Sequence, residues 1–353
     1  MLKIMKKNIY FFLFLLVLIT LPSCNNEIDM CTEWKETTVV YSLLDSDDSI
    51  SYIKVNKAFL GNENALVMAD IRDSSEYNQI DVKLEKYLNN KLVQTFIFEP
   101  IEIDNKEDGI FYNPYQTIYA ANTYGQLNSS FSTFPDTVFT YKIVITNNSN
   151  ETVWSQIYLI NDKLHVTKPI DPHDGRLPTI NFPNNTIAIT TVEWDTVPFA
   201  KYYKVDADFY FWEIHTSGDT IVRSIPWNNL RTVYSKPNDN RLSFHVNSIA
   251  FYELLKRDIP YKDGDQENKV IKRRPGNFVL NFKMAGHEYY NYVNNNNMSS
   301  GLSQEIPIYT NVENGIGLVS ARHKISFTCQ LAEQAKNSLY SDSQYDFLKF
   351  VNW

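Results

Sequence analysis

The chain has 353 residues, of which 43% are hydrophobic and 14% aromatic, and a formal net charge of −8. This length is typical of two domains with packed cores, and the acidic balance argues against nucleic acid or anionic lipid head groups as partners. Only 11 glycines occur, which disfavours glycine-rich phosphate-binding loops.

The N-terminal residues have the pattern of a bacterial lipoprotein signal. Three lysines precede an apolar run over 9–20, which is shorter than the about 20 apolar residues that a membrane-spanning helix needs. Leu21-Pro22-Ser23-Cys24 follows and resembles the lipobox. We expect residues 1–23 to be removed as a signal peptide and Cys24 to carry the lipid, palmitate included. The alternative is an ordinary secretory peptide with a chance cysteine.

Residues 24–36 are polar and acidic and are expected to form a tether behind the anchor. Two cysteines remain after lipidation, Cys31 and Cys329. In an oxidising compartment they can form a disulfide that joins the start of the mature chain to its end. The alternative is two separate thiols.

Alternating apolar residues predict a first β domain over residues 37–166. Tyr141, Ile143 and Ile145 alternate with less apolar positions, turn residues follow at 147–150, and the alternation resumes over 153–159. This pattern predicts a β-hairpin. Several such strands predict an antiparallel β-sandwich of immunoglobulin-like size.

A segment with four prolines, residues 167–183, is expected to link this domain to a second one over 184–353. The stretch from Val192 through Trp194 to Tyr203 and Val205 resembles the B–C strand pair of a fibronectin type III domain. We therefore expect a mainly β protein of two antiparallel β-sandwiches, the second interrupted by a short helix near 248–257. The core side of its long strand is predicted to carry Tyr203, Val205, Ala207, Phe209 and Phe211. A second short helix is expected over 330–339, and the asparagine run 294–297 is expected to form a loop.

Motifs for metal binding and catalysis are weak. Glu213 and His215 lie two residues apart on a strand, which is more typical of a solvated pair than of a zinc site. Residues 104–109 resemble the start of a calcium loop, but Lys106 occupies the third ligand position. No nucleophile elbow occurs in the sequence. We expect no metal, no cofactor and no catalytic residue, and a non-enzymatic protein.

Five aromatic residues are candidates for contact with a ligand or partner, because large rigid rings bind sugars and peptides at low entropic cost. They are Tyr210 and Trp212, on the strand face opposite the core set, and Tyr289, Tyr290 and Tyr292. Structural packing, for the first pair against the neighbouring domain, is the alternative explanation.

Four Asp-Ser/Thr-aliphatic tripeptides resemble the acceptor motif for O-glycosylation of exported Bacteroidota proteins. Their hydroxyl residues are Ser49, Thr137, Thr196 and Thr220. We expect glycan on one or more of them.

Most of the mature chain resembles a family of Bacteroidota outer-membrane lipoproteins that are often encoded beside TonB-dependent receptors. The resemblance lies in residues 57–61, 64–69 and 105–112, in the strand around Tyr141, and in residues 311–322. It implies a lipid-anchored accessory protein of the outer membrane, on the cell surface rather than the periplasmic face, that works with a TonB-dependent receptor in nutrient capture. It implies no catalytic residue. The alternatives are a free-standing glycan- or peptide-binding module and an adhesin subunit.

Overall fold

The computed structural model describes residues 37–58, 65–127, 130–131, 134–147, 151–160, 164–259, 269–298 and 309–352, and in these ranges the chain is mainly β, as expected. The first elements are β1 (Thr37–Leu44), β2 (Ile50–Ala58), α2 (Ala65–Ala69), α3 (Arg72–Ser75), β3 (Asp81–Leu88), β4 (Lys91–Ile103), β5 (Gln116–Asn122), β6 (Ser130–Phe131), β7 (Phe134–Thr146) and β8 (Thr152–Ile157). They are followed by β9 (Val166–Lys168), β10 (Thr179–Ile180), β11 (Ile189–Asp195), β12 (Tyr202–His215), β13 (Thr220–Tyr234), β14 (Arg241–Asn247), α4 (Ile249–Asp258), β15 (Val270–Ala285), α5 (His287–Met298), β16 (Ile316–Leu331), α6 (Glu333–Ser341) and the 3₁₀ helix η1 (Ser343–Leu348). None of the helices in these ranges has the length and apolar character needed to cross a membrane.

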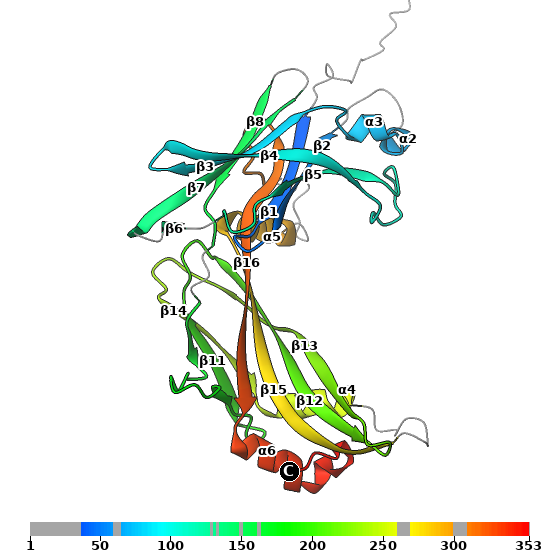
Figure 1. Cartoon of the computed structure of the whole chain (residues 1–353), viewed down its shortest axis with the longest axis vertical. Helices are drawn as coiled ribbons and strands as arrows, with labels where there is room; N and C mark the ends of the chain where they lie inside the picture. Colours follow the sequence, from blue (N-terminus) through cyan, green and yellow to red (C-terminus); the bar gives the residue numbers. More distant parts are fainter. Residues whose placement is uncertain are drawn as a thin grey trace, which may run out of the picture.

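Strand pairing connects both ends of the molecule. The main ladder runs in the order β13-β12-β15-β16-β1-β2-β5-β4-β3-β7-β6, with β10 paired to β16 and β8 paired to β7, while β14, β11 and β9 form a separate three-stranded sheet. Figure 1 shows the strands before β9 gathered at one end of the molecule and most later strands at the other, with β16 passing between them.

The N-terminal strands form two layers that are joined at both margins. At one margin β4 changes partner, because residues 91–98 pair with β3 and residues 99–103 pair with β5. At the other margin Trp154 in β8 exchanges two backbone hydrogen bonds with Glu313, just before β16. The predicted hairpin is confirmed, since Tyr141 in β7 lies opposite Ile157 in β8 in antiparallel register.

In the C-terminal part, the three-stranded sheet packs on the long strands of the main ladder around one tryptophan. Trp194 in β11 is fully buried, and its ring lies 5.7 Å from Tyr203, 5.3 Å from Phe282 and 6.0 Å from Phe244, centroid to centroid. The predicted core side of β12 is also confirmed: Tyr203, Val205, Ala207, Phe209 and Phe211 are all buried. Alternation alone selected this set because successive strand side chains point to opposite faces.

β16 belongs to both parts of the molecule. Its first residues, 316–321, pair in parallel with β1, and residues 322–330 pair in antiparallel with β15. The two groups of strands are therefore joined by the backbone of one continuous strand.

The proline-rich segment lies against the C-terminal strands. β9 pairs with β11 and β10 pairs with β16. Phe182 is buried in the core, and its carbonyl accepts a hydrogen bond of 2.6 Å from the Tyr252 hydroxyl. Burial of this apolar residue holds the segment in place despite its prolines.

The helix predicted near 248–257 is present as α4. The second helix, expected over 330–339, is present as α6 but begins later, at Glu333, because β16 continues to Leu331. The asparagine run 294–297 was wrongly expected to form a loop and lies within α5. Asparagine is a weak helix former, but packing of the helix against neighbouring strands can override that local preference. In α5 the ring of Tyr289 packs against that of Tyr202 in β12.

Lys86 is a lysine in the N-terminal core. It is 5% exposed, its Nζ donates a 2.8 Å hydrogen bond to the carbonyl of Gln126 and it lies 4.0 Å from the Phe139 ring centroid. Burial lowers the pKa of Lys86 to about 8. Between pH 8 and the ordinary lysine pKa, the unfolded chain therefore binds a proton at this residue that the folded chain does not.

The contribution of Lys86 to stability should accordingly rise with pH through that window, by at most about 1.4 kcal/mol per pH unit. We expect Lys86→Met to remove this rise. Buried acids such as Cys329 and Tyr203, whose pKa values burial raises to about 12, act in the opposite direction. The measurement is therefore the difference in unfolding free energy between variant and wild type at pH 7.5 to 10.5. Lys83→Met, a half-exposed lysine on the other face of β3, is the control, and equal slopes for both variants would contradict the expectation.

Candidate functional site

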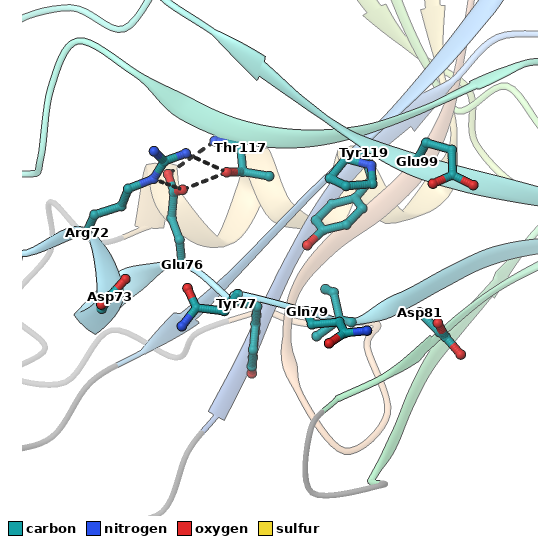
Figure 2. A pocket seen from close by; sticks show the side chains of 12 residues that line it. Arg72, Asp73, Glu76, Tyr77, Gln79, Asp81, Glu99, Thr117 and Tyr119 are labelled. Atoms are coloured by element: carbon teal, nitrogen blue, oxygen red, sulfur yellow. Dashed lines mark hydrogen bonds and ion pairs between the residues drawn. The ribbon is translucent and has the colours of Figure 1, made fainter.

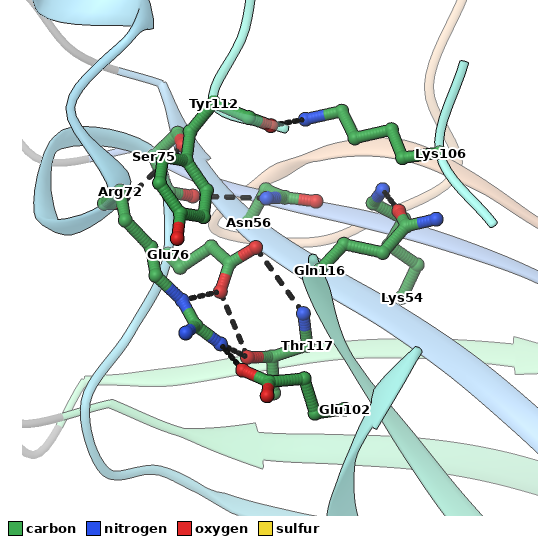
Figure 3. A network of polar contacts seen from close by, with 10 residues as sticks. All are labelled: Lys54, Asn56, Arg72, Ser75, Glu76, Glu102, Lys106, Tyr112, Gln116 and Thr117. Atoms are coloured by element: carbon green, nitrogen blue, oxygen red, sulfur yellow. Dashed lines mark hydrogen bonds and ion pairs between the residues drawn. The ribbon is translucent and has the colours of Figure 1, made fainter. Parts of the chain in front are cut away.

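A buried carboxylate organises the N-terminal surface between α3 and β5. Glu76 is 6% exposed. Its Oε1 accepts from the backbone N–H of Thr117 at 3.2 Å, and its Oε2 accepts from the Thr117 hydroxyl at 2.8 Å and from Arg72 Nε at 2.9 Å. Arg72 also pairs with Glu102 at 2.6 Å. Figure 3 shows these contacts converging on Glu76, so the segment after α3 is fastened to the start of β5.

One cavity, of about 530 Å³, lies beside this network, where β4 changes from one partner strand to the other. Figure 2 shows the Arg72–Glu76–Thr117 contacts at one end of it and Glu99 and Asp81 at the other. Four carboxylates and one guanidinium line the cavity, and the guanidinium is already paired with two carboxylates. Its charge is therefore negative, which disfavours anionic ligands.

A second cavity, of about 430 Å³, lies on the other side of the network and has the opposite charge. Lys54, Lys57 and Lys106 line it together with Phe111. Lys54 Nζ donates to the side-chain oxygen of Gln116, and Lys106 Nζ donates to the carbonyl of Tyr112 at 2.7 Å (Figure 3). Burial and the nearby charge of Lys106 lower the pKa of Lys54.

The three tyrosines at 289–292, which the sequence offered as candidates for contact with a ligand or partner, pack α5 against strands from both parts of the molecule. The ring of Tyr289 lies 5.3 Å from Tyr202 in β12, that of Tyr290 lies 5.1 Å from Tyr234 in β13, and Tyr292 hydrogen-bonds Tyr41 in β1. All three side chains are half-buried. These contacts support the structural explanation of this group.

Tyr210 and Trp212 lie on the outer face of β12. Tyr210 is 37% exposed, and Trp212 is half-buried beneath the guanidinium of Arg274, which lies 5.4 Å from its ring. Gly276 in β15 passes under the tryptophan, where an added Cβ would lie 3.2 Å from the ring. These neighbours come from the same sheet, so Trp212 is held within its own sheet and Tyr210 keeps an open surface.

The O-glycosylation candidates differ in accessibility. Ser49 and Thr220 are exposed, whereas Thr196 is half-buried and its hydroxyl donates to the carbonyl of Asp239 at 3.0 Å. Thr137 lies in β7, at a position whose side chain falls outside the described residues. Glycosylation stays a prediction, with Ser49 and Thr220 as its accessible sites.

Cys24 and Cys31 lie outside the described residues, so lipidation and the disulfide stay predictions. Cys329 is fully buried in β16 and its Sγ donates to the carbonyl of Phe278 at 3.1 Å. Burial raises the pKa of its thiol to about 12, which makes it a poor nucleophile at neutral pH.

Glu213 and His215 share a face, but they are buried and not solvated as the sequence suggested: both are 7% exposed. The carboxylate of Glu213 lies against the guanidinium of Arg273, at 2.9 Å. Arg273 lies opposite Glu213 on the neighbouring strand β15 and hydrogen-bonds the C-terminal segment at Leu348 and Lys349. These distant neighbours bury the position, and the spacing of two residues alone does not reveal them.

Sequence reasoning also missed a cluster formed by Asp45, Asp47 and His323, whose potential ligand atoms lie within 4.8 Å of one another. His323 is fully buried and its Nδ1 lies 2.9 Å from Asp45 Oδ1, so the imidazole N–H donates to this carboxylate. The pair fastens β16 to the turn after β1. Nothing in the local sequence marks it, because Asp45 and His323 lie 278 positions apart in the sequence.

A scan against protein-family models and a search of curated proteins find no match to this chain.

Proposed function

We propose that this protein is a lipid-anchored, non-enzymatic accessory or binding protein of the outer membrane that works with a TonB-dependent receptor in nutrient capture. The lipobox-like Leu21-Pro22-Ser23-Cys24 carries the proposal. A polar tether, residues 24–36, separates it from the β structure that begins at Thr37. This arrangement suits a folded body held close to a membrane by a lipidated cysteine.

The finer architecture that we propose is an immunoglobulin-like β-sandwich followed by a fibronectin-III-like one. The two joined layers before β9 support the first, and the packing of Trp194 between β11 and the long strands supports the second. Because β16 pairs with β1 over residues 316–321, the first sandwich includes residues from the end of the chain.

A binding role is supported by the polar surface around Glu76. There, Arg72, Thr117 and Glu102 are joined by mutual hydrogen bonds and ion pairs. Such a network fixes the shape of the surface between two cavities of opposite charge, as a binding site requires.

The anchor is tested by Cys24→Ala. We expect the variant to lose incorporation of a palmitate analogue and to move from the outer-membrane pellet to the released fraction. The physical reason is that no apolar chain then holds the tether to the bilayer.

Cys31→Ala is the matched control for this test, since it removes a second cysteine seven positions further along the same tether. It should stay labelled and membrane-bound. Retention of palmitate by the Cys24 variant would refute the anchor assignment.

The partner is tested by a gentle detergent pull-down of the tagged protein from its native outer membrane, read by mass spectrometry. We expect a TonB-dependent receptor in stoichiometric amount. Recovery of the lipoprotein alone would contradict the accessory role. It would favour the second candidate, a free-standing glycan- or peptide-binding module, which the open surface at Tyr210 beside Trp212 supports.

A further inference from the structure

Three lysines line the smaller cavity of the N-terminal surface. Lys54 and Lys57 come from β2, and Lys106 comes from the loop between β4 and β5. The described residues that line this cavity include no carboxylate. The lysine that disqualified residues 104–109 as a calcium loop is therefore one of the groups that give this cavity its positive charge.

The contacts of these lysines leave hydrogen-bonding capacity for a ligand. An ammonium group has three N–H donors. Lys54 donates to the side-chain amide oxygen of Gln116, and Lys106 donates to the backbone carbonyl of Tyr112. Both acceptors are neutral, so neither balances the positive charge. Lys57 lies over the ring of Tyr77, at 5.7 Å from its centroid.

Holding like charges together beside a cavity costs free energy, and the attraction of a bound anion to both charges would offset that cost. The lowered pKa of Lys54 has burial as its larger cause and the charge of Lys106 as the next, and both effects disfavour its protonated form. The carboxylate of Glu76 acts in the opposite direction but is the smaller influence, so the net shift is downward. An oxyanion placed between the two ammonium groups would accept charge-assisted hydrogen bonds from both, the strongest class in proteins.

The lining also includes apolar residues. Phe111 is 45% exposed and its ring centroid lies 5.5 Å from Lys106 Nζ, and Val39 and Ala58 also line the cavity. At about 430 Å³ the cavity lies within the size range of small-molecule sites. A ring or short hydrocarbon could cover Phe111 while the charged group faces the lysines.

We propose that the cavity lined by Lys54, Lys57, Lys106 and Phe111 binds a small organic oxyanion, a carboxylate or phosphate ester with an apolar body. The oxyanion lies between Lys54 and Lys106, and the apolar body lies on Phe111. This inference requires neither the lipid anchor nor the receptor, so its failure would leave the proposed function standing.

The test is calorimetric titration of the full lipidated chain, in a neutral detergent at low salt, with benzoate, phenyl phosphate and inorganic phosphate. We expect benzoate or phenyl phosphate to bind and benzyl alcohol, the neutral analogue, not to bind. The tighter of the two aromatic anions identifies carboxylate or phosphate as the preferred group. Absence of binding by both, up to about 10 mM where even weak affinities register, would overturn the proposal.

Variants locate the site. Lys54→Met and Lys106→Met should each weaken binding of the aromatic anion at least about tenfold, the loss expected when a charge-assisted hydrogen bond is removed. Lys83→Met removes the same charge from β3, outside the cavity lining, and should leave the affinity within about twofold. Equal losses in all three variants would indicate general charge attraction and refute the site.

Phe111→Ala tests where the apolar body of the ligand lies. The side chain is 45% exposed, so its removal should disturb the fold little. It should weaken benzoate several-fold and leave any affinity for inorganic phosphate unchanged, because phosphate has no apolar body to place on the ring. Unchanged affinity for benzoate would refute the assigned orientation.

Discussion

Gly317→Ala is expected to destabilise the protein by at least about 3 kcal/mol, because β1 and β16 cannot keep their pairing around an added methyl group. Gly317 has φ +130°, and a Cβ at this position would lie 1.9 Å from the carbonyl oxygen of Val40. Val40 cannot move aside easily. It is 1% exposed and is paired on its other side with Val55 in β2.

The measurement is urea unfolding together with amide hydrogen exchange. Exchange should accelerate in β1 and in residues 316–321 more than in β12 and β13, because the altered contact lies in the parallel ladder. Gly109→Ala is the matched control: no heavy atom lies within 4 Å of a Cβ at this exposed position. Similar unfolding midpoints for both variants would show that the β1–β16 pairing tolerates a side chain.

Glu213→Ala is expected to cost about 3–5 kcal/mol, the range for a buried ion pair that loses one partner. The side chains of Glu213 and Arg273 are 9% and 5% exposed. Arg273 Nε donates to Glu213 Oε1 at 2.9 Å, so alanine would leave a buried guanidinium without its carboxylate. The more exposed Arg223 also donates to Glu213, at 3.1 Å.

Arg273 further connects this pair to the end of the chain. Its Nη1 donates to the carbonyl of Leu348, and its backbone forms hydrogen bonds with Lys349 and Val351. We therefore expect Glu213→Ala to increase proteolysis within 343–352 as well as to lower the urea midpoint. The double variant Glu213→Ala/Arg273→Met, which removes the unpaired charge, should recover part of the loss.

The control for this second prediction is Glu193→Ala. Glu193 pairs with Lys168 and Arg241, both more than half exposed, at 3.5 and 3.4 Å. Exposed pairs contribute about 0–1 kcal/mol, so this variant should lose little stability. A loss in Glu213→Ala no greater than that in Glu193→Ala would contradict a structural role for the buried pair.

Local sequence patterns predicted the elements with a strong periodic signal. The core face of β12 from Tyr203 to Phe211, the β7–β8 hairpin and α4 were all predicted from the alternation or spacing of apolar residues. Those patterns succeed because burial of one face imposes a period of two on a strand and 3.6 on a helix. The asparagine run in α5 was missed because the local preference of asparagine says nothing of the strands that the helix packs against.

The candidate site was less predictable than the elements that carry it. Lys54 and Lys106 are 52 positions apart in the sequence, and each looks like an ordinary solvated lysine in its own segment. Glu76 and Thr117 are likewise joined only when the segment after α3 reaches β5. A useful signal was the lysine at a calcium-ligand position in 104–109, which indicated that the loop does not attract cations.

By itself, the sequence determined the β-rich character of this protein, the inward face of its long strand and the expectation of a lipid anchor at Cys24. Each of these follows from local patterns, in which the informative residues are near neighbours in the sequence. Only the tertiary structure decided that β16 pairs with both β1 and β15, that His323 contacts Asp45, and that three lysines share one cavity. These features depend on which distant segments become neighbours. Strand register and burial across the whole chain choose those neighbours, and no local pattern specifies them.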